Sequence, residues 1–99
     1  MFSPAQELQN RGFRLVEKSL SVGGARILAR VNLIEKTVCI DMETVARHAA
    51  EQGISVEQMR QQALAHELGH VLHPDLRGRA AEQAAQECVA RWQRGRTLA

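Results

Sequence analysis

Histidine is concentrated in one short stretch of this 99-residue chain, AHELGHVLH, which holds three of the four histidines. His66 and His70 enclose Glu67 in the pattern HExxH. On a helix, residues four apart lie about 40° apart around the axis and one turn apart along it, so both imidazoles can reach one ion. Imidazole nitrogen binds zinc at roughly 2.0–2.1 Å. The spacing therefore predicts a zinc site on a helix.

Glu67 directly follows the first of these histidines, so on a helix it is rotated away from the pair and is not needed as a ligand. Zinc would polarise a scissile carbonyl and activate a water. A carboxylate at Glu67 would take a proton from that water and pass it to the leaving amine. We therefore expect Glu67 to act as general base and acid in the hydrolysis of a peptide bond.

The alternative is a buried helix that carries two histidines by chance. Typical residue usage makes a random HExxH in a chain of this length an event of roughly a few per thousand. Apolar residues also surround the motif, so its polar groups would be buried and would need partners, which a metal can supply. This pattern favours the metal site. The surrounding apolar residues are Leu64, Leu68, Val71 and Leu72.

A catalytic zinc takes a third protein ligand and keeps a fourth position open. His73 lies about 10.5 Å from His66 along a straight helix axis, too far for all three histidines to hold one ion. A supporting or structural role for His73 is therefore the preferred interpretation. The longer pattern HExxHxxGxxH does not occur, because position 76 is leucine.

The third ligand is expected from the last helix, which offers Glu82 and Glu87. Glu82 lies nearer to the apolar stripe of that helix, whereas Glu87 lies farther round toward solvent. The short turn after His73 would also bring the first turn of the last helix back level with His70. Glu82 is favoured, Glu87 is the second choice, and two surface carboxylates without a metal are the remaining alternative. The stripe consists of Ala81, Ala85, Cys88, Val89 and Trp92.

The first forty residues change from helix to strands. Ser3 and Pro4 form an N-cap followed by proline, which predicts a short helix over residues 4 to 11. Strand-like runs cover residues 13 to 22, 25 to 34 and 37 to 41, and Gly23-Gly24 predicts a turn between the first two runs. Together they predict a three-stranded, mostly antiparallel meander. One face of the second run is apolar, with Ile27, Ala29, Val31 and Leu33.

Three helices are expected after the strands. Residues 42 to 52 have helical spacing of their apolar residues and end at Gly53, a typical C′ residue. The capping box SVEQ starts the helix that carries HExxH, which reaches about His73. The last helix is expected over residues 79 to 94. The order of elements indicates an α+β fold, with a small sheet packed on the HExxH helix and its neighbours in one domain over residues 1 to 99.

The formal charge of +2 is mild, and a hydrophobic content of 44% suits one small domain. No apolar run approaches membrane-spanning length and no leader-like segment is apparent, so we expect no membrane association and a cytoplasmic location. Cys39 and Cys88 belong to no CxxC pair and are expected to be reduced core thiols. A solvated helix face explains the late arginines better than a nucleic-acid surface does, so nucleic acid is not an expected partner. These arginines are Arg77, Arg79, Arg91, Arg94 and Arg96.

HExxH followed by a glutamate on the next helix resembles the gluzincins, the thermolysin-like division of zinc metallopeptidases. Within that division the chain resembles the compact ImmA/IrrE-type metallopeptidases and related minimal gluzincins. CID before a helix, then ALAHELGHVLH, then AAEQAAQECVARW follow one another in the order of that family. The resemblance implies that His66, His70 and Glu82 bind zinc and that Glu67 is the general base and acid. Many relatives read closer to EREAN, an alignment that puts Ala84 where their glutamate stands.

Two classes of function follow. The leading prediction is a zinc-dependent peptidase that cuts an extended segment of a protein or peptide. In such folds a sheet edge holds the substrate by strand addition, and ARILARVN is the candidate edge. His48, His73 or an arginine remain as donors for the oxyanion. So short a chain is expected to be weak alone, latent, or dependent on a partner or a homodimer. The alternative is a zincin-fold binding or regulatory module that does no chemistry, which Ala84 and the small size favour.

Overall fold

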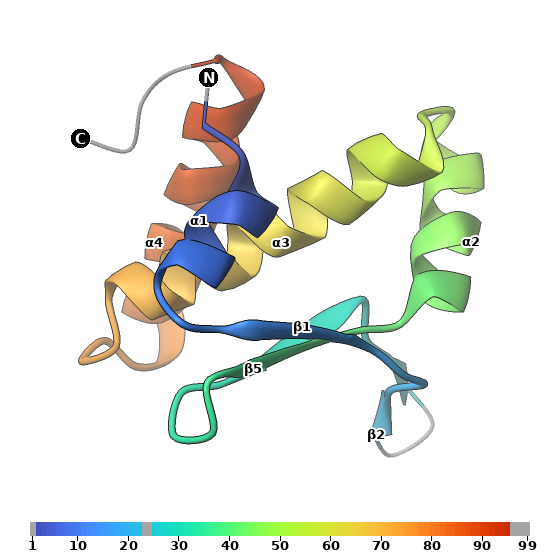
Figure 1. Ribbon diagram of the computed structural model, residues 1–99. Coiled ribbons are helices and arrows are strands. Elements are labelled where there is room, and N and C mark those ends of the chain that lie inside the picture. The colour runs from blue at the N-terminus through green and yellow to red at the C-terminus, as the bar shows by residue number, and fades with distance from the viewer. Residues whose placement is uncertain (1, 23–24, 96–99) are drawn as a thin grey trace.

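A computed structural model of the chain describes residues 2–22 and 25–95. The helices gather on one side of a small sheet, so the predicted α+β class is confirmed (Figure 1). The helices are α1 (Pro4–Asn10), α2 (Met42–Gln52), α3 (Val56–Leu72) and α4 (Gly78–Gln93). The strands are β1 (Arg14–Glu17), β2 (Ser21–Val22), β3 (Ala25–Arg26), β4 (Ala29–Asn32) and β5 (Thr37–Ile40).

β5 lies in the middle of the three-stranded sheet, in the order β1-β5-β4. It pairs antiparallel with β4 but parallel with β1, so the sheet is mixed and the predicted meander is wrong in its first pairing. Val38 and Ile40 of β5 are only 0% and 1% exposed, and the middle of the sheet is the place where both edges of a strand are covered. Arg14 and Glu17 are exposed and suit an outer strand.

The run predicted over residues 25 to 34 is divided into two strands. β3 pairs with β2 in a separate antiparallel hairpin, and the turn predicted at Gly23-Gly24 lies outside the described residues. The predicted alternation holds in β4, where Ala29 is buried and Val31 is half-buried. Leu33, predicted to share that face, lies beyond the end of the strand and is 39% exposed.

In the described part of the chain, β4 is paired along one edge only. The Asp41 N–H donates to the Leu28 carbonyl, so Leu28 and Arg30 direct their backbone groups toward β5. The backbone groups of Ala29 and Val31 therefore point toward the free edge. Contacts between β4 and α3 place this part of the sheet beside α3.

α3 is the central helix and packs against α1, α2, α4 and β4. Its N-terminus is capped by Ser55, whose hydroxyl accepts a hydrogen bond from the Gln58 N–H at 3.0 Å, as the capping box predicts. The helix ends before His73, also as predicted. Residues 63–69 are buried except for the half-buried His66, so the motif lies in the interior of the helical layer.

Asp41 joins the sheet to α2. Its Oδ1 accepts a hydrogen bond from the Thr44 N–H at 3.1 Å and so caps the helix. Its Oδ2 accepts from the Leu20 N–H at 2.9 Å. The side chain therefore fixes the start of α2 against the segment that follows β1. Gly53 ends α2 in the left-handed conformation, with φ 69°, as the sequence predicts.

The first and last helices also agree with the sequence. α1 and α4 each begin and end within one residue of the predicted bounds. The Ser3 hydroxyl caps α1 by accepting from the Gln6 N–H, and Pro4 occupies the first helical position. Within residues 2–22 and 25–95, no helix is both long and apolar enough to cross a membrane.

Candidate metal centre

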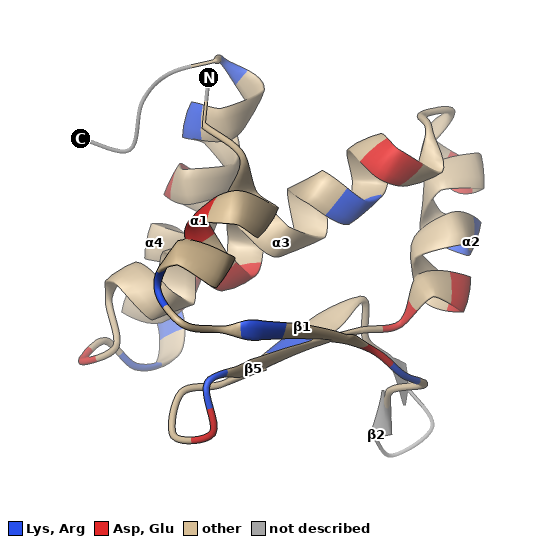
Figure 2. Ribbon diagram, viewed as in Figure 1, with Lys and Arg blue, Asp and Glu red and all other residues tan. Residues whose placement is uncertain are grey.

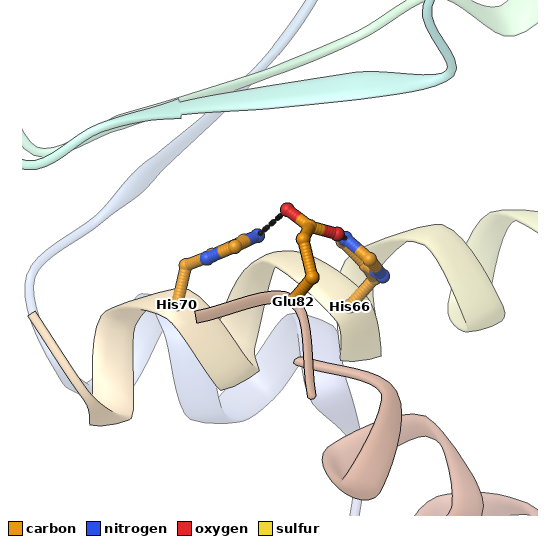
Figure 3. A group of neighbouring side chains, drawn as sticks. All are labelled: His66, His70 and Glu82. Carbon is orange, nitrogen blue, oxygen red and sulfur yellow. Dashed lines mark ion pairs between the residues drawn. The ribbon is translucent and has the colours of Figure 1, made fainter. Parts of the chain in front are cut away.

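Three side chains from two helices converge on one point (Figure 3). His66 and His70 extend from α3, and Glu82 extends from the first turns of α4. The His66 Nε2 atom lies 3.2 Å from Glu82 Oε2, and the His70 Nε2 atom lies 3.3 Å from Glu82 Oε1. The two imidazole rings stand edge to face with their centroids 5.1 Å apart. The fold thus brings the favoured glutamate to the histidine pair.

The spacing of these atoms fits a tetrahedral metal. Ligand atoms about 2.0–2.1 Å from a tetrahedral zinc lie about 3.3 Å from one another. Each imidazole nitrogen lies at about this distance from one oxygen of Glu82, His66 from Oε2 and His70 from Oε1. One ligand atom from each residue lies within 4.8 Å of the others. Burial lowers the pKa of His66 against the opposing effect of Glu82, which favours the neutral imidazole that a metal requires. The residues fit zinc, and the same distances also suit hydrogen bonds from imidazole to carboxylate.

Glu67 lies in a different environment. Only 7% of its surface is exposed. Burial, followed by the negative charge of Glu82, raises the pKa of Glu67 to about 8, while a hydrogen bond from the Val31 backbone opposes the shift. Val31 directs its backbone groups toward the free edge of β4, so this edge reaches the residue predicted to be the general base.

A close approach of α3 and α4 explains how Glu82 reaches the histidines. A Cβ atom on Gly69 would lie 2.4 Å from the Ala85 Cα and 3.0 Å from the Ala84 carbonyl oxygen, so glycine allows this contact and a larger residue does not. Ala85 lies about one turn beyond Glu82 on the same side of α4. Packing at Gly69 therefore directs the Glu82 carboxylate to the histidine face. Ala84, which the EREAN alignment favours, presents its backbone to α3.

The other candidates lie elsewhere. Glu87 forms ion pairs with Arg91 and Arg94 at 3.5 and 3.8 Å, on an exposed side of α4. Burial raises the pKa of the Cys88 thiol to about 11, so this thiol stays protonated and is a poor ligand. His73 is the exposed C-cap of α3 and does not belong to the group of three.

Two adjoining pockets meet at the candidate centre, and both are lined by Ile27, Ala29, His66 and Glu67. The first, here called the apolar pocket, has a volume of about 220 Å³. It lies beside the N-terminal half of α3. The rest of its lining is mostly apolar and consists of Leu28, Met59, Gln62, Ala63 and Val89.

The second pocket, here called the polar pocket, has a volume of about 400 Å³ and lies toward the C-terminal end of α3. It contains the whole candidate centre together with several basic side chains and the β4 edge. His48, which the sequence left open as an oxyanion donor, does not line it, whereas His73 does. Its other lining residues include Arg30, Val31, Leu33, Pro74, Leu76 and Arg77.

Three contributors to this region were not found from the sequence: Gly69, the Val31 backbone and Arg77. A lone glycine inside a helix is a local signal of close packing, so Gly69 could have been found. The alternation of ARILARVN marks the strand that contains Val31, but the bond from its backbone to Glu67 and the place of Arg77 beside the centre come only from tertiary structure.

In comparisons with known proteins, no family model matches the chain and no curated protein matches it in sequence. Function is therefore inferred from the residues of the site and from the resemblance of their motif.

Proposed function

We propose that the chain is a zinc-dependent peptidase of the gluzincin type. The observation that supports this most is the meeting of HExxH with Glu82, which puts two imidazoles and one carboxylate at ligand spacing. Glu67 lies buried beside them. Three protein ligands and an open side facing the polar pocket are what a catalytic zinc site requires.

In this proposal each residue has one task. His66, His70 and Glu82 would hold the ion, which would act as a Lewis acid and activate a water near neutral pH. Glu67 accepts a proton from the attacking water and delivers it to the leaving amine. In the metal-free chain, burial and then the charge of Glu82 raise the pKa of Glu67 to about 8, so the carboxyl group is mostly protonated near neutral pH. A cation bound nearby would lower that pKa and make the carboxylate available as a base.

The proposed substrate is an extended segment of a protein or peptide. The Ala29 N–H and carbonyl point toward the free edge of β4 and can pair with an added strand. The apolar pocket adjoins both His66 and Glu67, so it can hold an apolar side chain next to the cleaved bond.

The proposed location is the cytoplasm. Cys39 and Cys88 are free thiols, and Cys88 is buried.

A protein partner or a second copy of the chain would add a wall to the open cleft, and cleavage is expected to increase when that wall is present.

Metal analysis and a cleavage assay test the proposal together. Protein purified without chelators or a metal-binding tag should contain about one zinc per chain, the content of a single three-ligand site. Glu67→Gln should keep its zinc and lose about 10²- to 10⁴-fold in cleavage of a peptide mixture. The control is Glu57→Gln, which replaces an exposed glutamate of the same helix and should keep both the zinc content and the cleavage rate. Wild type that binds no added zinc, or cleavage unaffected by Glu67→Gln, would contradict the proposal.

A zincin-fold binding or regulatory module is the second candidate. One observation favours it: the Glu82 side chain is 57% exposed, so the third ligand is less firmly fixed than the two histidines. Such a module has no rate to lose when Glu67 is replaced. The same comparison of Glu67→Gln with Glu57→Gln therefore separates the two candidates.

A further inference from the structure

The polar pocket is lined by an arginine that has no acidic partner among the described residues. Basic positions occur in the sheet layer and near the start of α4 as well as on the helices (Figure 2). Helical arginines commonly pair with a glutamate of their own helix, which neutralises them. Arg77 forms no such pair within the described chain, and it lines the polar pocket beside the candidate centre. The pairs on the helices include Arg11–Glu7, Arg47–Glu43, Arg60–Glu57 and Arg91–Glu87.

The Arg77 guanidinium is held by the loop between α3 and α4. Its Nη1 donates to the Pro74 carbonyl at 2.8 Å and to the Leu76 carbonyl at 3.0 Å. Pro74 and Leu76 both line the polar pocket, so these bonds hold the guanidinium at the pocket wall. An arginine has five N–H donors, and the two bonds leave those on Nε and Nη2 available. A fixed guanidinium with free donors is well suited to bind a carboxylate.

The other charged groups around the pocket do not supply that carboxylate. Glu82 contacts the two histidines, and Glu67 is buried and bonded to the Val31 backbone. Arg30 borders the same pocket, but alternation along β4 puts its side chain on the sheet face opposite to that of buried Ala29. Of the two arginines that line this pocket in the described part of the chain, Arg77 is therefore the one that hydrogen bonds hold at the pocket wall.

The two pockets extend in opposite directions along α3 from Glu67. Met59 and Ala63 line only the apolar pocket, whereas His73 and Pro74 line only the polar one. From Glu67 to Leu72, the last residue of α3, the helix rises by roughly 7.5 Å at 1.5 Å per residue, and Pro74 lies two residues beyond that end. An extended peptide covers the distance to Pro74 with about three residues.

We propose that Arg77 binds a carboxylate of the peptide substrate about three residues from the cleaved bond, on the side away from the apolar pocket. This inference rests on the proposed function. The carboxylate belongs either to an acidic side chain or to the free C-terminus of a short peptide. Arg77 is thus a specificity residue, and it makes the enzyme selective for acidic segments.

Binding to zinc-loaded Glu67→Gln measures this selectivity without requiring cleavage. The probes are fluorescent peptides with a central leucine and either glutamate or glutamine at one position, scanned outward on both sides. A second set compares a free C-terminus with an amidated one, which separates the two sources of the carboxylate. Arg77→Gln is added to the Glu67→Gln background, and Arg79→Gln is the matched control, because Arg79 is an exposed arginine of the same segment that does not line the pocket.

We expect the best glutamate peptide, or the free C-terminus, to bind about fivefold more tightly than its neutral partner, the gain of one charge-assisted contact at a partly exposed site. Arg77→Gln should reduce that ratio to about one, and Arg79→Gln should leave it unchanged. Arg77→Lys keeps the positive charge and should keep part of the preference for the charged peptide. It therefore separates the loss of the charge from the loss of the hydrogen bonds to the loop. Three results would overturn the inference. The Glu67→Gln protein with Arg77 intact could bind charged and neutral peptides equally, or the preference for the charged peptide could persist in Arg77→Gln. Arg77→Gln could also weaken the binding of both peptides to the same extent.

Cleavage by zinc-loaded wild type distinguishes this failure from that of the proposed function. If the protein cleaves peptides without preferring acidic ones, the proposed peptidase function stands and the proposed role of Arg77 is wrong. Acidic preference in binding without any cleavage retains the role of Arg77 and favours the binding module. If no peptide binds, both the proposed function and the proposed role of Arg77 are wrong.

Discussion

At the base of the cleft, Glu67 is 7% exposed and Gly69 lies against the backbone of α4. At its rim, the Glu82 side chain is 57% exposed and Arg77 is held by two carbonyls of a loop. Both regions belong to one candidate site, but they depend on the fold in different ways. The base is part of the packed interior, whereas the rim is formed by side chains that solvent can reach.

Because their burial differs, substitutions at the base and at the rim should have different effects on folding and on ligand binding. A change at the base alters the free energy of unfolding even without a ligand, because buried groups have no solvent to replace a lost contact. A change at the rim should alter ligand binding and leave the metal-free fold nearly intact.

The largest effect expected at the base is a pH dependence of folding in the metal-free protein. The pKa of Glu67 is about 8 in the folded chain, against an ordinary value of 4.5, so between these pH values the folded chain holds a proton that the unfolded chain has released. The free energy of unfolding should therefore fall as the pH rises through this range, by on the order of 5 kcal/mol from this group. Urea unfolding at a series of pH values measures it.

Glu67→Gln removes this titrating group, so the free energy of unfolding of the variant should lack the part of the pH dependence that comes from Glu67. The quantity to compare is the difference between wild type and variant at each pH, because other titrating groups cancel in it. Glu57→Gln on the same helix changes the same charge at an exposed position and should leave the difference constant. If the free energies of unfolding of wild type and Glu67→Gln changed with pH in parallel, the carboxyl group of Glu67 would be hydrated in the folded chain. The base of the cleft would then not differ from the rim in its burial.

A smaller effect is expected from the contact between α3 and α4. The Cβ atom of Gly69→Ala would meet the Ala85 Cα at 2.4 Å, and backbone cannot rotate aside as a side chain can. We expect a loss of about 3 kcal/mol in the free energy of unfolding, at the upper end for overpacking. The control is Gly78→Ala, where nothing lies within 4 Å but φ is +58°, so strain alone costs about 1 kcal/mol. Equal losses in the two variants would show that the helices separate without cost.

The fold was predictable where the signals are local. Ser55 and Gln58 predict the start of α3, and Gly53 predicts the end of α2, because each acts through neighbours a few residues away. The parallel pairing of β1 with β5 was not predictable in this way. It joins segments separated by a hairpin and another strand, and sequential neighbours are the natural first choice for pairing.

The candidate site shows the same division. His66, Glu67 and His70 share one helix, so their spacing alone fixes how they lie. Glu82 was favoured over Glu87 from its position near the apolar stripe, and the structure places it at the histidines. The alternation of β4 predicts the strand that carries Val31, whereas the bond from Val31 to Glu67 and the loop bonds of Arg77 depend on tertiary packing.

The smallest effect on folding is expected at the rim, where Glu82→Gln has a matched control in Glu87→Gln. The two glutamates lie on the same helix, and their side chains are 57% and 58% exposed. In the metal-free protein each substitution should change the free energy of unfolding by less than about 1 kcal/mol, as is usual for exposed ion pairs. Added zinc should then stabilise wild type and Glu87→Gln in urea unfolding, because it binds the folded chain, but it should stabilise Glu82→Gln much less. A large loss for metal-free Glu82→Gln would show that the rim belongs to the packed structure. Equal stabilisation of all three proteins by zinc would instead remove Glu82 from the metal centre and leave the contrast in burial intact.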